Sequence, residues 1–514
     1  MHVRKWRELS NFNDIIKNMK SFGMSHEKNE VLYSALKSKD PRFDGHFFVG
    51  VASTGIYCRP ICKARLPKIE NCTFFISAAE AEKAGYRPCL LCRPELTPGL
   101  APIFSTENLA RRTAKIIEDN CKFDSSFSKL AEQLGCTDRH LRRVFVKEYH
   151  VSPVQYLQTC RLLLAKSLLT DTNLSIMDIA MTSGFGSLRR FNDLFKKQYK
   201  LPPSGFRKQL DGRSNKDFDS ITLLLGYRPP YNWKQMLDFL KQRAIPKVEL
   251  IKDDEYYRTV HITLSNDKEY FGWIKVENME EKNAVALTIS HTLFPQLPRV
   301  LNRVKHLFDL FCEPRVIYEK LSSMNEIIPE IIVLGTRVPG CFDAFEMSVR
   351  AILGQQITVK AATTLAGRFA KNFGTPIETG IDQLEYAFPS PCEIVELKEP
   401  IEDHLGPIGV IAKRAKTIMA MAKVFANNTI EIESCVNPED SIKQLMELPG
   451  IGMWTAQYIA MRAMGWMDAF PDTDLGVKKV LAPRTQKEIL ALAESWRPWR
   501  AYATINLWNY HNGG

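Results

Sequence analysis

The stretch LPGIGMWTAQYIAMRAMGWMDAFPDTD, residues 448–474, decides how the C-terminal part of the chain folds. Gly450 and Gly452 stand between two helical patterns, and glycine tolerates the backbone angles of a tight turn. The first N–H groups of a helix have no partner inside the helix, so they can bind a phosphate. The pattern predicts a helix-hairpin-helix that binds a DNA backbone, an element that enzymes share with proteins that have no catalytic activity.

An acidic loop follows this hairpin, with Asp472 and Asp474 after Pro471. A carboxylate in a partly dry pocket can stabilise positive charge that develops during a reaction. Both aspartates are candidates for this carboxylate from their residue types alone.

The composition describes a globular chain with an anionic partner. A length of 514 residues suggests three or four domains. The net charge of +11 favours an anionic partner and does not by itself separate DNA from RNA or a membrane surface. A transmembrane span needs a run of about 18 apolar residues, and no such run is found. The N-terminus has no apolar core like that of a signal peptide. We therefore expect a soluble cytoplasmic monomer that does not bind membranes.

Four of the twelve cysteines form two close pairs, which are Cys58-x3-Cys62 and Cys89-x2-Cys92. In a reducing compartment this spacing predicts one tetrahedral zinc ion with four thiolate ligands. Two functions are open for it: a structural clip in a domain with a small core, or a reactive thiolate centre.

The residues around these cysteines carry a resemblance. TGIYCRPICKAR (54–65) and AGYRPCLLCRPE (84–95) resemble the N-terminal zinc domain of the Ada family. The resemblance implies that Cys58 accepts a methyl group from a DNA phosphotriester. We expect nearby cations to hold the DNA backbone, namely Arg59, Lys63, Arg65 and Arg93. Methylation removes one negative charge, so DNA affinity should rise and the repair event should also act as a sensor.

Two helix-turn-helix patterns follow, at 127–149 and 175–199. Residues 126–208 contain 14 Lys or Arg against 6 Asp or Glu, so most of the net positive charge lies here. The pair resembles the DNA-binding domain of the AraC family, which implies promoter DNA as a partner and leaves RNA polymerase as a candidate partner. A helical bundle with a solvated basic face is the alternative. The expected DNA contacts are Arg139, Arg142, Arg143, Arg189 and Arg190.

Residues 256–290 alternate between apolar and polar side chains, which predicts antiparallel strands with one buried face. Nothing in 220–330 indicates catalysis. The predicted fold class is multidomain, mainly α with α+β parts, and residues 1–30 are given no function. The expected domains are a polar extension (1–30), a zinc domain (31–97), a helix-turn-helix domain (98–210), a linker and α+β domain (211–330) and an all-α helix-hairpin-helix domain (331–514).

The C-terminal half is similar to the helix-hairpin-helix base-excision glycosylases, in the 3-methyladenine branch. The motifs are LGQQIT (353–358), LPGIGMWTA (448–456), FPDTDLGVKK (470–479) and WRPWRAYA (496–503). The LGVKK that follows Asp474 aligns this residue with the essential carboxylate of the family. Asp472 is then expected to cap a helix or to be solvated.

The resemblance also implies the rest of the site. Trp454, Tyr458 and Trp508 are expected to line the base pocket, whereas Trp496 and Trp499 are expected to pack in the core. Gln356 stands where the family inserts a residue into the DNA stack.

Two features narrow the reaction class. Trp454 occupies the position of the lysine that gives bifunctional relatives lyase activity, so we expect a monofunctional glycosylase. No cysteine follows Cys435, so no iron–sulfur cluster is expected.

The sequence therefore predicts a fused protein that repairs and responds to DNA alkylation. A transcription regulator whose glycosylase half binds DNA without excising bases is the alternative of a different class. A purely structural zinc module is a third possibility.

Overall fold

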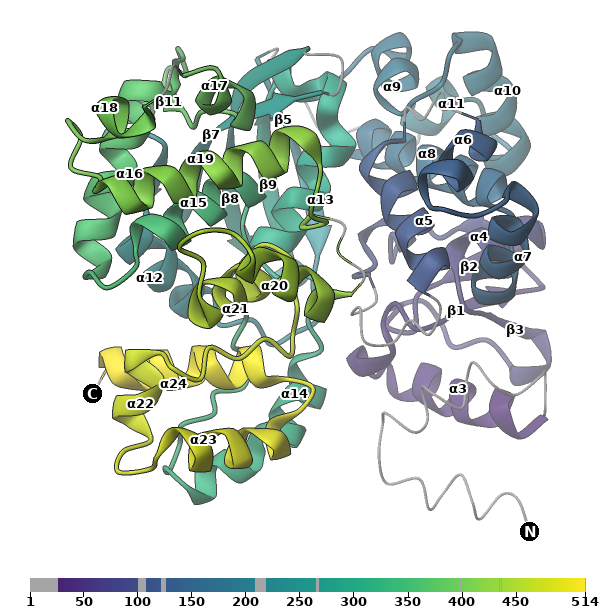
Figure 1. Cartoon of the computed structure of the whole chain (residues 1–514). Coiled ribbons are helices and arrows are strands. Elements are labelled where there is room, and N and C mark those ends of the chain that lie inside the picture. Colours follow the sequence, from purple (N-terminus) through teal and green to yellow (C-terminus); the bar gives the residue numbers. More distant parts are fainter. Residues whose placement is uncertain are drawn as a thin grey trace.

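The computed structural model describes residues 26–99, 108–121, 126–208, 219–264, 268–397, 400–433, 435 and 437–513. Residues 1–25 of the predicted polar extension and residues 211–218 of the predicted linker lie outside these residues. In Figure 1 the N-terminal half, drawn from purple to blue, stands beside the C-terminal half, drawn from teal to yellow. No helix among the described residues is long and apolar enough to cross a membrane.

The zinc module is a small sheet with two helices. Its strands are ordered β3-β1-β2-β4, and the elements are α3 (His26–Ser38), β1 (Phe48–Val51), β2 (Ile56–Cys58), β3 (Cys72–Phe75), α4 (Ala78–Lys83) and β4 (Arg87–Pro88). β1 pairs antiparallel with β2 and β3, and β2 pairs parallel with β4. This pairing brings the first cysteine pair, at the end of β2, beside the second pair, which follows β4.

The next segment contains the two predicted helix-turn-helix units on either side of a long link helix. The elements are α5 (Asn108–Asp119), α6 (Phe127–Gln133), α7 (Asp138–Tyr149), α8 (Pro153–Asp171), α9 (Ile176–Thr182), α10 (Leu188–Tyr199) and α11 (Pro203–Lys208). The side chains of Thr137 and Ser187 cap α7 and α10, the second helices of the two units. Phe191, Phe195 and Tyr199 are buried and follow one another at helical spacing on α10.

The α+β domain contains a five-stranded antiparallel sheet in the order β5-β9-β8-β7-β6. The strands are β5 (Ser220–Gly226), β6 (Glu249–Lys252), β7 (Glu255–Thr263), β8 (Glu269–Met279) and β9 (Ala284–Ser290). Three of them were expected, but β5 and β6 were not. The expectation of one buried face is wrong for β9, which is buried along nearly its whole length. Because successive side chains of a strand point to opposite faces, both faces of β9 are covered.

The C-terminal part is helical and surrounds the hairpin. Its main helices are α15 (Ala344–Leu353), α16 (Val359–Phe373), α19 (Ala412–Asn427), α20 (Pro438–Met446), α21 (Met453–Arg462), α22 (Leu475–Val480), α23 (Gln486–Ala493) and α24 (Arg500–Gly513). Trp496 and Trp499 are buried here, and Trp496 lies edge-on to the buried Phe470.

One apolar core runs from Leu32 of the zinc module to Trp508 near the C-terminus, so the two halves of the chain share it. Helix α8 packs against β5, the edge strand of the five-stranded sheet, and α5 packs against α13 (Leu297–Leu307). The multidomain, mainly helical fold class is confirmed.

Candidate active sites

Asp474 is held by four N–H groups. Its Oδ1 accepts hydrogen bonds from the backbone N–H groups of Gly476 (2.8 Å) and Val477 (3.2 Å) and from Trp508 Nε1 (2.8 Å). Its Oδ2 accepts a hydrogen bond from Trp454 Nε1 (2.9 Å). The carboxylate is therefore the N-cap of α22 and is also fixed by two indole groups from distant segments.

Aromatic rings line the space beside this carboxylate. The ring of Trp454 stacks on Tyr458 with a centroid distance of 5.2 Å and an interplanar angle of 17°. Trp508 lies 6.2 Å from Tyr458, at a tilt of 40°. The structure thus brings Asp474 together with the three aromatic residues expected to line the base pocket.

Asp472 was expected to cap a helix or to be solvated, and both expectations are wrong. Asp474 is the residue that caps α22, and Asp472 is only 7% exposed. The Oδ2 atom of Asp472 accepts a hydrogen bond from Gln486 Nε2 at 2.5 Å, which holds the acidic loop against the start of α23. Asp472 therefore supports the loop from inside the protein.

A helix of the α+β domain also contacts this site, although no residue of 220–330 was expected to be catalytic. Phe239, on α12 (Trp233–Arg243), stacks on Trp508 at 6.3 Å. The guanidinium of Arg243 lies 3.8 Å from the centre of the Phe239 ring. The sequence carries no signal for this contact, because α12 reads as an ordinary amphipathic helix.

Three arginines surround the Tyr458 hydroxyl. Arg462 Nη1 donates to the Tyr458 hydroxyl oxygen at 2.8 Å. Burial alone would raise the pKa of Tyr458, but the positive charges of Arg462, Arg243 and Arg350 lower it below its usual value. Burial lowers the pKa of Arg243 itself to about 10. The Tyr458 hydroxyl therefore lies in an electropositive environment.

The hairpin before α21 has the predicted form. Gly450 has a φ of +82°, and a Cβ there would meet Thr417 Oγ1. Gly452 begins α21 and faces open space, so a phosphate can approach the first N–H groups of the helix. Thr417 Oγ1 donates to the carbonyl of Pro449 at 2.8 Å, and Gln355 Nε2 donates to the carbonyl of Gly450 at 2.9 Å.

Gln355 and Gln356, in the LGQQIT loop, have different surroundings. Gln355 holds the hairpin, a function that sequence reasoning did not assign. Gln356 is exposed and has a φ of +56°, which is uncommon for a residue other than glycine. Its side chain is thus exposed to solvent, while the preceding residue, Gln355, is bonded to the turn at Gly450.

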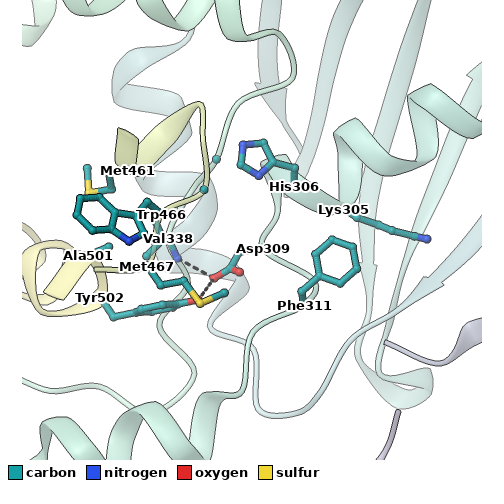
Figure 2. Close-up of a pocket in the computed structure, with 12 residues that line it drawn as sticks. Lys305, His306, Asp309, Phe311, Val338, Met461, Trp466, Met467, Ala501 and Tyr502 are labelled. Carbon is teal, nitrogen blue, oxygen red and sulfur yellow. Dashed lines mark hydrogen bonds between the residues drawn. The ribbon is translucent and has the colours of Figure 1, made fainter. Parts of the chain in front are cut away.

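A small cavity of about 60 Å³ lies behind α21, apart from Asp474. Figure 2 shows Asp309 in it, and the carboxylate accepts hydrogen bonds from the Val338 backbone (3.1 Å) and from the Tyr502 hydroxyl (2.9 Å). Burial raises the pKa of Asp309 to about 6 and lowers the pKa of His306 to about 4. His306 Nε2 is 3.0 Å from the carbonyl oxygen of Arg462. The cavity therefore lies against α21, the helix that carries Trp454 and Tyr458.

The second site is the cysteine cluster. The Sγ atoms of Cys58, Cys62, Cys89 and Cys92 all lie within 4.8 Å of one another. Four thiolates at this spacing repel each other unless a cation lies between them, and zinc prefers such a donor set. The residues therefore fit the zinc ion that the spacing predicts.

Exposure does not select one cysteine as the reactive one. Cys58, Cys62 and Cys89 are 8%, 7% and 7% exposed, and Cys92 is half-buried. One of the four sulfurs accepts a backbone hydrogen bond: the N–H of Arg59 donates to Cys92 Sγ at 3.4 Å. The geometry of the cluster therefore does not single out Cys58.

Arg59 does not face DNA as expected. It is 7% exposed, pairs with the Asp44 carboxylate and donates from Nη1 to the carbonyl of Cys92 at 3.2 Å. Arg93 likewise contacts another part of the protein: it forms a bidentate salt bridge with Asp171 of α8, with N–O distances of 2.7 and 2.6 Å. Arg65 and Lys63 are exposed and remain available for a phosphate.

The expected helix-turn-helix contacts all lie on the surface. Arg139, Arg142 and Arg143 are exposed on α7, and Arg189 and Arg190 are exposed on α10. Arg142 also pairs with Asp138 one turn earlier, at 2.8 Å. Both second helices thus present cations to solvent, as DNA binding requires.

Comparison with known proteins shows the same order of domains. Residues 31–95 match the metal binding domain of Ada and residues 130–209 match a helix-turn-helix domain. Residues 222–343 match the AlkA N-terminal domain, and residues 349–487 match the HhH-GPD superfamily of base excision DNA repair proteins.

A relative in Mycobacterium tuberculosis, described as a probable bifunctional transcriptional activator/DNA repair enzyme AlkA, is 33% identical over 491 residues, which cover 94% of this chain and 96% of the relative. The chain belongs to this family. DNA-3-methyladenine glycosylase 2 of Escherichia coli is 33% identical over 285 residues, 55% of this chain and 95% of that protein. The bifunctional activator and repair enzyme AdaA of Bacillus subtilis is 34% identical over 176 residues, 34% of this chain and 81% of that protein.

These matches confirm the family resemblances seen in the sequence. The chain is a bifunctional DNA repair and response protein that carries a metal-binding Ada domain, a helix-turn-helix DNA-binding domain and a base-excision glycosylase domain. Zinc binding and DNA binding follow from the same domains.

Proposed function

We propose that Asp474 is the catalytic carboxylate of a monofunctional glycosylase that releases alkylated bases of the 3-methyladenine type. The observation that carries this proposal is the set of four N–H donors on Asp474 beside the stacked rings of Trp454 and Tyr458. A flipped, electron-poor base stacks well on such rings. Trp454 supplies no amine, so the site has no nucleophile for a Schiff base at this position.

The two oxygens of Asp474 have different roles in this proposal. Oδ1 accepts three hydrogen bonds, whereas Oδ2 accepts one and keeps capacity to face the sugar. As the C1′–N bond breaks, its electron pair leaves with the base and positive charge develops at C1′ near Oδ2. A water oxygen then bonds to C1′, and the proton it loses is taken up by the carboxylate.

Cys58 is proposed as the methyl acceptor of the second site. Its sulfur attacks the methyl carbon of a phosphotriester, the S–C bond forms, the O–C bond breaks, and the electron pair of that bond leaves with the phosphodiester. Bound zinc keeps the four thiolates deprotonated at neutral pH. Cys58 is chosen because its segment TGIYCRP resembles the acceptor segment of the Ada family, and residues 31–95 match the metal binding domain of Ada.

The DNA contacts and the assembly complete the proposal. Gly450 and Gly452 bind a backbone phosphate, Gln356 fills the gap left by a flipped base, and Arg65 holds the phosphotriester strand. The exposed arginines of α7 and α10 bind promoter DNA, with RNA polymerase as the further partner of a monomeric activator. The proposed cofactor is one zinc ion without an iron–sulfur cluster, and the proposed domain boundaries lie near residues 30, 97, 210 and 330.

Release of 3-methyladenine from methylated duplex DNA by the full-length protein tests the glycosylase. We expect the free base to appear with time, without strand cleavage at the abasic site. Tight binding to the same DNA with no free base would support instead a regulator whose glycosylase half does not excise. Strand cleavage coupled to base release would contradict the monofunctional assignment.

Mass spectrometry of the protein after incubation with methylphosphotriester DNA tests the second site. We expect one added methyl group, located on the peptide that contains Cys58. An unmodified protein would indicate a structural zinc module, and a methyl group on another cysteine would reject the assigned acceptor.

A further inference from the structure

The zinc module and the glycosylase half meet in a buried polar contact. Arg228, which follows β5, is 2% exposed. Its Nε donates to the carbonyl of Asp44 at 3.0 Å, and its Nη1 and Nη2 donate to the carbonyl of Gly99 at 3.0 and 3.1 Å. The guanidinium of the glycosylase half is therefore satisfied largely by backbone carbonyls of the N-terminal half.

Glu313 supplies the opposite charge at this contact. It is 2% exposed and its Oε1 lies 3.2 Å from Arg228 Nη1 and 3.1 Å from His46 Nε2. The Glu313 carboxylate thus pairs with Arg228 in its own half of the chain and with His46 in the N-terminal half. Charged groups remain buried only when they are paired, so each half contains groups that the other half satisfies.

The backbones of the two halves also touch directly at glycines. A Cβ on Gly99 would clash with the ring of Phe311, and a Cβ on Gly226 would clash with the carbonyl of Leu96. These positions leave no room for a larger residue, so the contact has the close packing of a protein interior.

The contact continues to the zinc ligands through Asp44. The carboxylate of Asp44 accepts hydrogen bonds from Nε (2.9 Å) and Nη2 of Arg59, the residue after Cys58. The backbone N–H of Arg59 donates to Cys92 Sγ at 3.4 Å. Asp44 therefore binds the ligand loop with its carboxylate and the glycosylase half with its carbonyl oxygen.

We infer that the glycosylase half holds the methyl-acceptor site in its working geometry, with Arg228 and Glu313 as positioning residues for the four-thiolate centre. The methyl-transfer part of this inference rests on the proposed function of Cys58. Its physical basis is size: the zinc module has a short four-stranded sheet and little core of its own, and small domains need additional links to be stable. The links run from Arg228 through Asp44 to Arg59.

The test uses full-length Arg228→Met and Glu313→Gln, which remove respectively the donors to Asp44 and Gly99 and the charge that neutralises Arg228. The first readout is the rate at which a chelator removes zinc. The second is the visible spectrum of the cobalt-substituted protein, which reports the geometry of the thiolate ligands. The third is the rate of methyl transfer to Cys58 with zinc in excess.

The matched control is Glu346→Gln. Glu346 is also 2% exposed and pairs with an arginine, Arg258 at 2.6 Å, but this pair lies wholly within the glycosylase half. We expect zinc release to accelerate by about tenfold in both test variants, with an altered cobalt spectrum and slower methyl transfer, and to stay near the wild-type rate in the control.

Equal zinc release in wild type and both test variants would overturn the inference, and so would equal acceleration in Glu346→Gln, because the effect would then be general destabilisation. If Arg228→Met does not fold, a double-mutant cycle of His46→Gln and Glu313→Gln replaces it. Additive effects on zinc release in that cycle would also reject the inference. If the wild type transfers no methyl group, the proposed function of Cys58 fails, while zinc release and the cobalt spectrum still decide the positioning role.

Discussion

The two reactive sites of this protein handle negative charge in opposite ways. Asp474 is a single carboxylate stabilised by four neutral N–H donors drawn from α22, α21 and α24. The cysteine cluster places four thiols together within 35 residues of sequence and needs a cation to neutralise them. The first site is assembled by the tertiary fold, whereas the second is assembled locally and supported from outside. A change at the centre of one site should therefore leave the other site active, whereas a change at Arg228, in the glycosylase half, should affect the thiolate centre.

The largest expected effect is at the thiolate centre. Cys58→Ser should abolish methyl transfer, because a serine hydroxyl at neutral pH is neither a thiolate nor a comparable nucleophile. Base release by the same variant should continue. Mass spectrometry and the base-release assay measure both. Cys72→Ser, a change of the nearby cysteine outside the cluster, is the control and should transfer methyl groups normally. Methyl transfer by Cys58→Ser would remove the assigned acceptor.

At the other site, Asp474→Asn should lower the rate of base release by on the order of 1,000-fold, because the amide cannot stabilise charge at C1′. Methyl transfer to Cys58 should not change. The measurement is single-turnover release of 3-methyladenine. Asp472→Asn, which changes the buried aspartate of the same loop, is the matched control. A larger loss in Asp472→Asn than in Asp474→Asn would reverse the assignment of the two carboxylates.

Trp454→Phe sharpens the comparison within the carboxylate site. The variant keeps a ring on Tyr458 but removes the N–H that donates to Oδ2 of Asp474. A hydrogen bond to a charged group contributes about 1.5–3 kcal/mol, so base release should slow by roughly 10- to 100-fold. Single-turnover kinetics check this loss. Trp466→Phe, a change at the cavity behind α21, should have a much smaller effect, and equal losses in both variants would indicate packing alone.

The smallest expected effect is at the exposed loop. Gln356→Ala should weaken binding to duplex DNA that contains an abasic-site analogue by a few-fold, about 1 kcal/mol or less, because its side chain makes a surface contact. Gln355→Ala should cost more, since Gln355 bonds to the hairpin at Gly450 and also to Thr455 (3.0 Å). Fluorescence anisotropy measures both affinities. A larger loss in Gln356→Ala would make that residue the principal wedge.

Local patterns were predictable from the sequence where the interaction is local. The paired helix-turn-helix units, the Gly450 turn and the clustered cysteines each depend on residues a few positions apart, so spacing alone identifies them. The strands β5 and β6 were missed, because β5 is separated in sequence from its partner β9 and β6 is only four residues long.

The orientation of side chains was not predictable in the same way. Arg59 and Arg93 read as phosphate contacts because they are cations beside zinc ligands, yet each is buried against a carboxylate. Asp472 read as solvated because it is acidic and lies in a loop, yet it is buried against Gln486. In each case the partner is far away in the sequence or has no distinctive motif, so residue type alone gives the wrong exposure.

For the stretch 448–474, the sequence by itself determined the hairpin, the acidic loop and the family to which they belong. Only the tertiary structure decided that Asp474 receives two indole N–H groups, that α12 closes the aromatic pocket, and that the zinc module is joined to the glycosylase half through Arg228. The physical reason is the distance along the sequence over which each kind of interaction acts. Turns, caps and ligand spacings are fixed by neighbouring residues, whereas the hydration and pairing of a buried charge depend on which distant segments the fold brings against it.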